Sequence, residues 1–173
     1  MSAAIVGILR AVLEEPCADS LEWARALSES TTPRAAWETY RDPAGLAWFV
    51  ASLDTQRGVE LSRKAIALAQ EALRARRKER NKAREEWHAL IGAYNDQRAY
   101  EQARVRLECA EDALAETENA LGIARAQDIE DAHAVMEAVA AATSRGDALA
   151  LIHREVPWEW IEERLPKARG EDG

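Results

Sequence analysis

The side chains that could act as nucleophiles, general bases or metal ligands are few and scattered. His88, His133 and His153 lie far apart in the sequence, and none has a second ligand at the spacing of an HExxH zinc motif. Cys17 and Cys109 form neither a CxxC pair nor a dense cysteine framework. We therefore expect no metal site and no disulfide framework, with both thiols reduced.

Motifs for nucleotide binding and catalysis are also missing from the sequence. Neither GxGxxG nor GxxxxGK[ST] occurs. The carboxylates are spread along helical segments, so no isolated pair has the divergent environments that acid-base chemistry needs. Cys109 with His133 would need a third orienting group and an oxyanion hole, and we instead expect Cys109 to be a small packed residue near a helix seam. The sequence thus predicts a protein that is not an enzyme and uses no cofactor.

The most informative pattern is a change of charge sign along a proline-free helical stretch, from about residue 59 to residue 142. Its first half contains seven basic residues within eleven positions, against Glu79 alone: Arg74, Arg76, Arg77, Lys78, Arg80, Lys82 and Arg84. Its second half is acidic, and the candidate protein-binding acids there are Glu111, Asp112, Glu116 and Glu118. Two helical arms of opposite charge can pair with each other or with a partner.

The formal net charge of −8 argues against a general affinity for nucleic acid. The basic run from Arg74 to Arg84 is the exception, because a local excess of arginine and lysine can bind phosphate. A nucleic-acid-associated protein that uses this run therefore stays a third alternative. A solvated helix face matched by internal acids is the simpler interpretation.

Apolar residues in the charged stretch follow two heptad seams that are out of phase by one residue. The first seam contains Val59, Ile66, Leu73, Trp87 and Tyr94 and is interrupted by Arg76 and Arg80. The second seam contains Tyr100, Leu107, Leu114 and Leu121. The break falls at residues 92–96, where Gly92 can end one helix and Asn95 or Asp96 can cap the next. We predict an antiparallel helical hairpin, with one continuous helix as the alternative.

Two expectations about contacts follow from this hairpin. Folding about residue 94 would bring Arg77 near Glu111 and Arg76 near Asp112, so that the basic run finds acids on its own partner helix. The second seam would stay exposed unless something covers it, and a second copy of the chain is the nearest cover. We therefore expect a homo-oligomer that associates through Tyr100, Leu107, Leu114 and Leu121.

Short, strongly punctuated helices are expected at both ends of the chain. Apolar spacing predicts helices near residues 4–13 and 19–27, and Thr32-Pro33 and Asp42-Pro43 each supply an N-cap oxygen followed by proline at the first helical position. Asp147 is expected to cap a later helix and Pro157 to open the last one. Trp158 and Trp160 cannot both face the core from one regular helix, so Trp160 is expected to be an exposed protein-binding anchor.

The predicted fold class is all-α, with a compact Trp-containing bundle formed from the two chain ends and a long charged hairpin between them. The expected division is an N-terminal bundle at 1–55, the hairpin at 56–143, C-terminal helices that pack on the bundle at 144–166, and a frayed tail at 167–173.

The segments from Leu21 to Ala24, Thr32 to Trp37 and Asp42 to Trp48 resemble a Trp-rich helical module of uncharacterised bacterial and phage proteins, including immunity proteins. That module reads Arg-Gly-Asp-Trp-Leu-x-Trp-Leu, whereas this chain lacks the first Trp of the cluster and inserts Pro43. Val156-Pro157-Trp158-Glu159 adds support near the end. The resemblance covers about residues 21–53; it implies a bacterial or phage origin and an all-helical fold, and it carries no catalytic residue.

We expect a cytoplasmic protein, because Arg10 and Glu14-Glu15 do not fit a signal peptide and no apolar run is long enough to span a bilayer. The preferred function is a non-enzymatic protein-interaction or assembly role, with a protein partner of unknown identity. The alternative is an anti-defence or immunity factor whose acidic surface blocks the basic site of a nuclease or effector.

Overall fold

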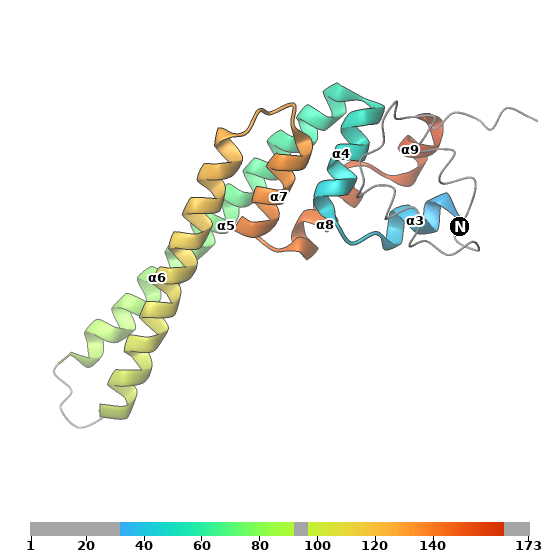
Figure 1. The fold of residues 1–173 in the computed structure, drawn as a ribbon. Coiled ribbons are helices and arrows are strands. Elements are labelled where there is room, and N and C mark those ends of the chain that lie inside the picture. The colour runs from blue at the N-terminus through green and yellow to red at the C-terminus, as the bar shows by residue number, and fades with distance from the viewer. Residues whose placement is uncertain (1–31, 92–96, 165–173) are drawn as a thin grey trace, which may run out of the picture.

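The computed structural model describes residues 32–91 and 97–164, and these residues form helices and no strand. The expectation of an all-α fold is confirmed (Figure 1). The helices are α3 (Pro33–Thr39), α4 (Pro43–Leu53), α5 (Thr55–Leu90), α6 (Gln97–Ala126), α7 (Ala132–Ala142), α8 (Arg145–Glu155) and α9 (Trp158–Arg164). The helices expected near 4–13 and 19–27, the break at 92–96 and the tail at 167–173 lie outside the described residues.

The two predicted cap-and-proline starts are confirmed. The Thr32 hydroxyl accepts a hydrogen bond of 3.2 Å from the Ala35 amide, and Pro33 begins α3. Asp42 caps α4 with both carboxylate oxygens, which accept from the amides of Ala44 and Gly45 at 3.2 and 3.1 Å. These caps satisfy amides that have no partner inside the helix, and they fix where each short helix begins.

One hydrophobic core joins α3, α4, α7, α8 and α9 to the first half of α5 and the end of α6. Trp37 is 3% exposed and contacts Phe49, with 6.3 Å between the ring centroids. The largest fully buried side chains in this core are Leu46, Val50, Leu61, Leu121, Val135, Met136, Val139, Ile152, Val156 and Ile161. Each such side chain contributes about 1.5–3 kcal/mol when removed from water.

The long helices α5 and α6 lie side by side and run in opposite directions, so the chain folds back instead of continuing as one helix (Figure 1). Beyond Leu73 of α5 and before Ala120 of α6, the pair extends away from the shorter helices. We call residues 74–90 and 97–119 the arm, and residues 32–73 and 120–164 the head.

The hairpin is shorter at its C-terminal end than the expected range of 56–143. Helix α6 ends at Ala126, and α7 packs on α4, α5 and α6 as part of the head. Asp128 accepts from the Glu130 amide in the turn, and Asp131 caps α7 by accepting from the Ala134 amide. Two aspartates that offer local hydrogen bonds thus break a helix that the apolar spacing continues.

The cap of α8 also differs from the expectation. Ser144, not Asp147, is the N-cap residue, and its hydroxyl accepts from the Asp147 amide at 3.0 Å. The Asp147 carboxylate in turn lies 2.7 Å from the Ser144 hydroxyl. Asp147 therefore serves as the third helical residue of a reciprocal cap, where a carboxylate is favourable.

Candidate protein-interaction surface

The structure places the predicted basic residues along the arm on α5. Arg80 is partly buried in the seam with α6, and the other six are exposed. Arg76 pairs with Glu79 at 2.9 Å, and Lys82 lies 3.9 Å from Glu86. Exposed pairs of this kind contribute about 0–1 kcal/mol each, so they do not make the basic residues unavailable to a partner.

The cross-helix pairing differs from the expected register. Arg77 pairs with Glu118 at 2.9 Å instead of Glu111, and Glu86 lies 3.7 Å from Arg106. Helical side chains lean toward the N-terminus of their own helix, and in an antiparallel pair these directions converge. A long arginine on α5 therefore meets an acid further along α6 than the residue level with its Cα atom.

Much of the charge on the arm is unpaired in the part of the chain that the structure describes. Arg74, Lys78 and Arg84 have no ion pair within residues 32–91 and 97–164, and neither do three exposed acids of α6. Those acids are Glu111, Asp112 and Glu116, whereas Glu118 pairs with Arg77. The arm thus presents basic side chains on α5 and acidic side chains on α6.

The seam residues expected to mediate self-association already pack against α5 within a single chain. Leu107, Leu114 and Leu121 are 8%, 9% and 2% exposed because α5 covers them, and Leu121 also belongs to the core of the head. Tyr100 is partly buried, with its ring centroid 6.3 Å from that of Trp87. The open apolar stripe that the expectation requires is absent from the described arm, since the fold-back itself covers it.

Trp160 is not the exposed anchor that the sequence indicated. Both Trp158 and Trp160 are partly buried against the core, because the short helix α9, about two turns long, packs into the head. The guanidinium carbon of Arg164 lies 4.0 Å from the Trp160 ring centroid, and that of Arg57 lies 5.8 Å away. Cation–π contacts on this ring leave little of it for a partner.

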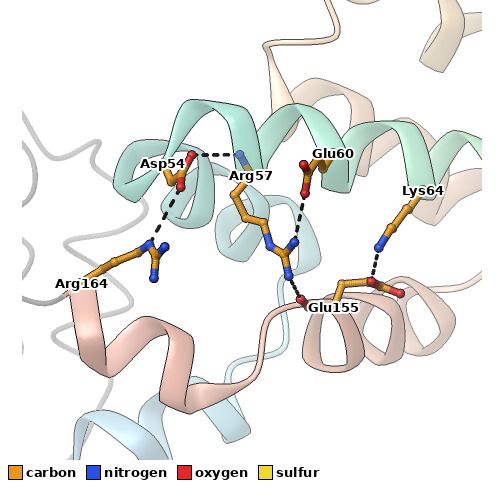
Figure 2. Close-up of polar contacts among 6 residues, drawn as sticks. All are labelled: Asp54, Arg57, Glu60, Lys64, Glu155 and Arg164. Atoms are coloured by element: carbon orange, nitrogen blue, oxygen red, sulfur yellow. Dashed lines mark hydrogen bonds and ion pairs between the residues drawn. The ribbon is translucent and has the colours of Figure 1, made fainter.

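A polar cluster around Arg57 fixes this end of the head (Figure 2). Arg57 donates to the backbone carbonyl of Glu155 at the end of α8 and pairs with Glu60 at 3.0 Å. Lys64 pairs with the Glu155 carboxylate and lowers the pKa of that group. Asp54 caps α5 and lies 3.9 Å from Arg164 of α9. We call Asp54, Arg57, Glu60, Lys64, Glu155 and Arg164 the Arg57 cluster, and its contacts join α5, α8 and α9.

A surface hollow of about 560 Å³ lies between α4, α7 and α8, and no pattern in the sequence predicted it. Its polar lining residues are Asp42, His133, Glu137 and Arg145. These residues come together only in the fold, since 91 positions separate Asp42 from His133. Within the described residues, no group of three or more histidine, cysteine, aspartate or glutamate side chains could hold a metal ion.

Cys109 lies on the outside of α6, contrary to the expectation of a packed residue. It follows Leu107 by two positions, which is more than half a turn around the helix from the seam. His88 is exposed near the tip, and His153 lies against the Trp37 ring with 5.6 Å between centroids. The structure therefore brings none of these groups together as a nucleophile and base.

Neither a protein-family model nor a curated protein nor a solved structure matches this chain. The resemblance over residues 21–53 therefore stays a prediction from the residues that carry it. None of the helices within 32–91 and 97–164 combines the length and the apolar character that crossing a bilayer demands.

Proposed function

We propose that the protein is a non-enzymatic protein-interaction module of bacterial or phage origin, in which the head carries the arm and the arm binds another protein. One observation supports this function above all. The arm extends from the head with unpaired basic side chains on one helix and unpaired acidic side chains on the other. Exposed charges of this kind steer association and select the partner by electrostatic complementarity.

The packing of the arm supports the same proposal. No side chain of α5 from residue 74 to residue 90 is buried, whereas Ala65 and Ala69 in the head are 0% exposed. An ordered helical pair that buries so little apolar surface adds little to the stability of the fold. Its length is better explained by contacts that it makes with another molecule.

A blocking role for the acidic helix is the second candidate function. Glu111, Asp112 and Glu116 are exposed within two turns of α6 and have no ion-pair partner among the described residues. Three carboxylates so close together resemble the phosphate charges that a nuclease or effector would bind. An immunity or anti-defence factor could cover such a basic site with this stretch.

Site-specific photo-crosslinking of the full-length chain tests the proposed function. A photoreactive residue at Ala115, which is exposed on the arm, is compared with one at Ala141, which is exposed on the head. We expect one discrete protein adduct from position 115 in bacterial lysate and none from position 141. The double variant Asp112→Lys, Glu116→Lys should reduce this adduct about tenfold.

Mass spectrometry of the adduct identifies the partner, and a basic nuclease or effector there would favour the blocking role. Equal adducts from both positions would contradict an arm-specific interface. If the two charge reversals leave the amount of adduct unchanged, the proposal that charge selects the partner is contradicted.

A further inference from the structure

The side of α6 that faces away from α5 carries a regular row of exposed side chains. Its six residues alternate four and three positions apart and so follow one line along the helix: Val105, Cys109, Asp112, Glu116, Asn119 and Ile123. Val105 and Ile123 are 50% and 47% exposed, so they offer apolar surface near the two ends of this row. We call this row the acidic edge. Its spacing is that of a helix surface on which another helix can pack.

The side of α5 that faces away from α6 carries a matching row. The residues at that spacing are all exposed: Glu71, Ala75, Lys78, Lys82, Glu85 and Ala89. Arg74 lies beside this row, and we call Arg74, Ala75, Lys78, Lys82, Glu85 and Ala89 the basic edge, because three of the four charges among them are positive. The two alanines leave room for a neighbouring helix to approach closely. The lysine stems can cover an apolar side chain such as Val105 while their charged ends stay in water.

The charged parts of the two edges lie at similar heights on the arm. Lys78 is twelve residues before the end of α5, and Asp112 is fifteen residues after the start of α6. At 1.5 Å per residue these positions are about 18 and 22 Å from the tip of the arm. Arg74 is about 24 Å from the tip by the same measure, so two arms placed side by side and pointing the same way bring Arg74 and Lys78 of one copy close to level with Asp112 of the other.

From these observations we propose that a second copy of this chain docks on the arm, with the acidic edge of one copy against the basic edge of the next. This inference rests on the proposed function and names the partner of the arm. Charge complementarity selects this occupant, since each copy supplies both surfaces and Arg74 and Lys78 of one lie close to level with Asp112 of the next. The seam leucines take no part, because they are covered within each chain.

This contact joins two different surfaces, so each added copy leaves one acidic and one basic edge free. Such heterologous contacts continue into open assemblies unless the rotation between copies closes a ring. The contact depends on exposed charges, which salt screens over about 10 Å at 0.1 M and less at higher concentration. Assembly should therefore grow with protein concentration and weaken as salt is added.

Charge exchange between two full-length variants tests the proposal. The first variant, Asp112→Lys with Glu116→Lys, has two basic edges, and the second variant, Lys78→Glu with Lys82→Glu, has two acidic edges. Analytical ultracentrifugation should show assembly of the wild type at low salt and at least about tenfold weaker assembly at 0.5 M salt. Each variant alone should sediment as a monomer, whereas their equimolar mixture should assemble again.

A matched control reverses charges of the same sign elsewhere on the chain. Glu137→Lys with Glu163→Lys changes two exposed acids of the head and should leave assembly unchanged. A wild type that stays monomeric at low salt would overturn the proposal, and so would a mixture that fails to assemble. If the wild type is monomeric but photo-crosslinking from position 115 still traps a different protein, the proposed function stands and only this inference fails.

A disulfide measurement places the contact on the two edges independently of charge. In a Cys17→Ser background, Ala75→Cys puts a thiol on the basic edge, on the opposite side of the arm from native Cys109. Oxidation should give a ladder of linked chains at low salt, and Ala141→Cys on the head should not. Linkage at the same rate from both positions would mean random collision and would contradict the proposed docking.

Discussion

The head and the arm share the same two long helices, yet their packing differs sharply. In the head, α5 contacts α4, α7 and α8 as well as α6, and its alanines reach 0% exposure. In the arm, among the residues that the structure describes, each helix has only the other as neighbour. The α5 side of the seam there holds Arg80, Ala83 and Trp87, all partly exposed. A helix with one neighbour buries one narrow stripe, so the arm depends more on helix propensity and local ion pairs than on a core.

The strongest test of this contrast compares one core truncation in each region. Ile152→Ala removes a fully buried side chain of the head and should lower the free energy of unfolding by about 2–5 kcal/mol. Leu107→Ala in the arm should cost less than about 2 kcal/mol, because one neighbouring helix can close around the smaller side chain. Chemical denaturation followed by circular dichroism measures both, and equal losses would contradict the distinction between the two regions.

The Arg57 cluster should account for the next largest effect, and it lies in the head. Arg57→Met removes the donor to the Glu155 carbonyl and the partner of Glu60, so we expect a loss of about 1–3 kcal/mol. Arg63→Met, at an exposed position six residues along the same helix, should stay within about 0.5 kcal/mol of the wild type. If the two variants have the same melting temperature, the contacts of Arg57 add no stability to the head.

In the arm the corresponding arginine substitution should have the opposite sign. The Arg80 Nε atom is buried in the seam without a hydrogen-bond partner in the described structure. Arg80→Leu removes that unsatisfied donor and restores the apolar seam, which should stabilise the arm by about 1 kcal/mol. Hydrogen exchange of the arm amides should slow in this variant and not in Arg74→Leu. Faster exchange would show that the arginine itself stabilises the pair.

The smallest expected effect is a pH dependence confined to the head. Burial lowers the pKa of His153 below its ordinary value of 6.5, and Arg41 acts in the same direction, while a hydrogen bond with the Trp37 backbone and the charge of Glu38 oppose them. The unfolded chain therefore takes up this proton first as the pH falls below about 6.5, and stability decreases in that range. Melting temperatures of the wild type should drop from pH 7 to pH 5 more than those of His153→Asn. A His133→Gln control should follow the wild type.

Features governed by neighbouring residues could be predicted from the sequence. The starts of α3 and α4 depend on Thr32 and Asp42 with the prolines that follow them, and a capping hydrogen bond needs only three or four consecutive residues. The fold-back between α5 and α6 could be expected because the apolar seam changes phase. The capping signals are complete within a few consecutive residues, and the change of phase follows from the regular spacing along each of the two helices.

Features that depend on contacts between residues far apart in the sequence could not be predicted. The break between α6 and α7 was missed because Ile129, Ala132 and Met136 continue the apolar spacing through the turn, and the capping aspartates look like ordinary surface acids. Trp160 packs against the core of the head and contacts Arg57, which is about a hundred positions away in the sequence. For the candidate site, the acidic residues of α6 could be identified from the sequence. Which of them are exposed depends on the side of α6 that α5 covers, and only the structure shows that side.

Helix α5 runs without interruption from the head to the tip of the arm. At Gly58 this helix lies close against α4, and an added Cβ atom there would lie 2.5 Å from the Ala51 Cβ atom. The helix continues for about 48 Å beyond this contact, so a rotation of only 10° there would displace the tip by about 8 Å. A methyl group added at Gly58 would have to shift this contact, and any tilt of α5 that results would be largest at the charged surface near the tip.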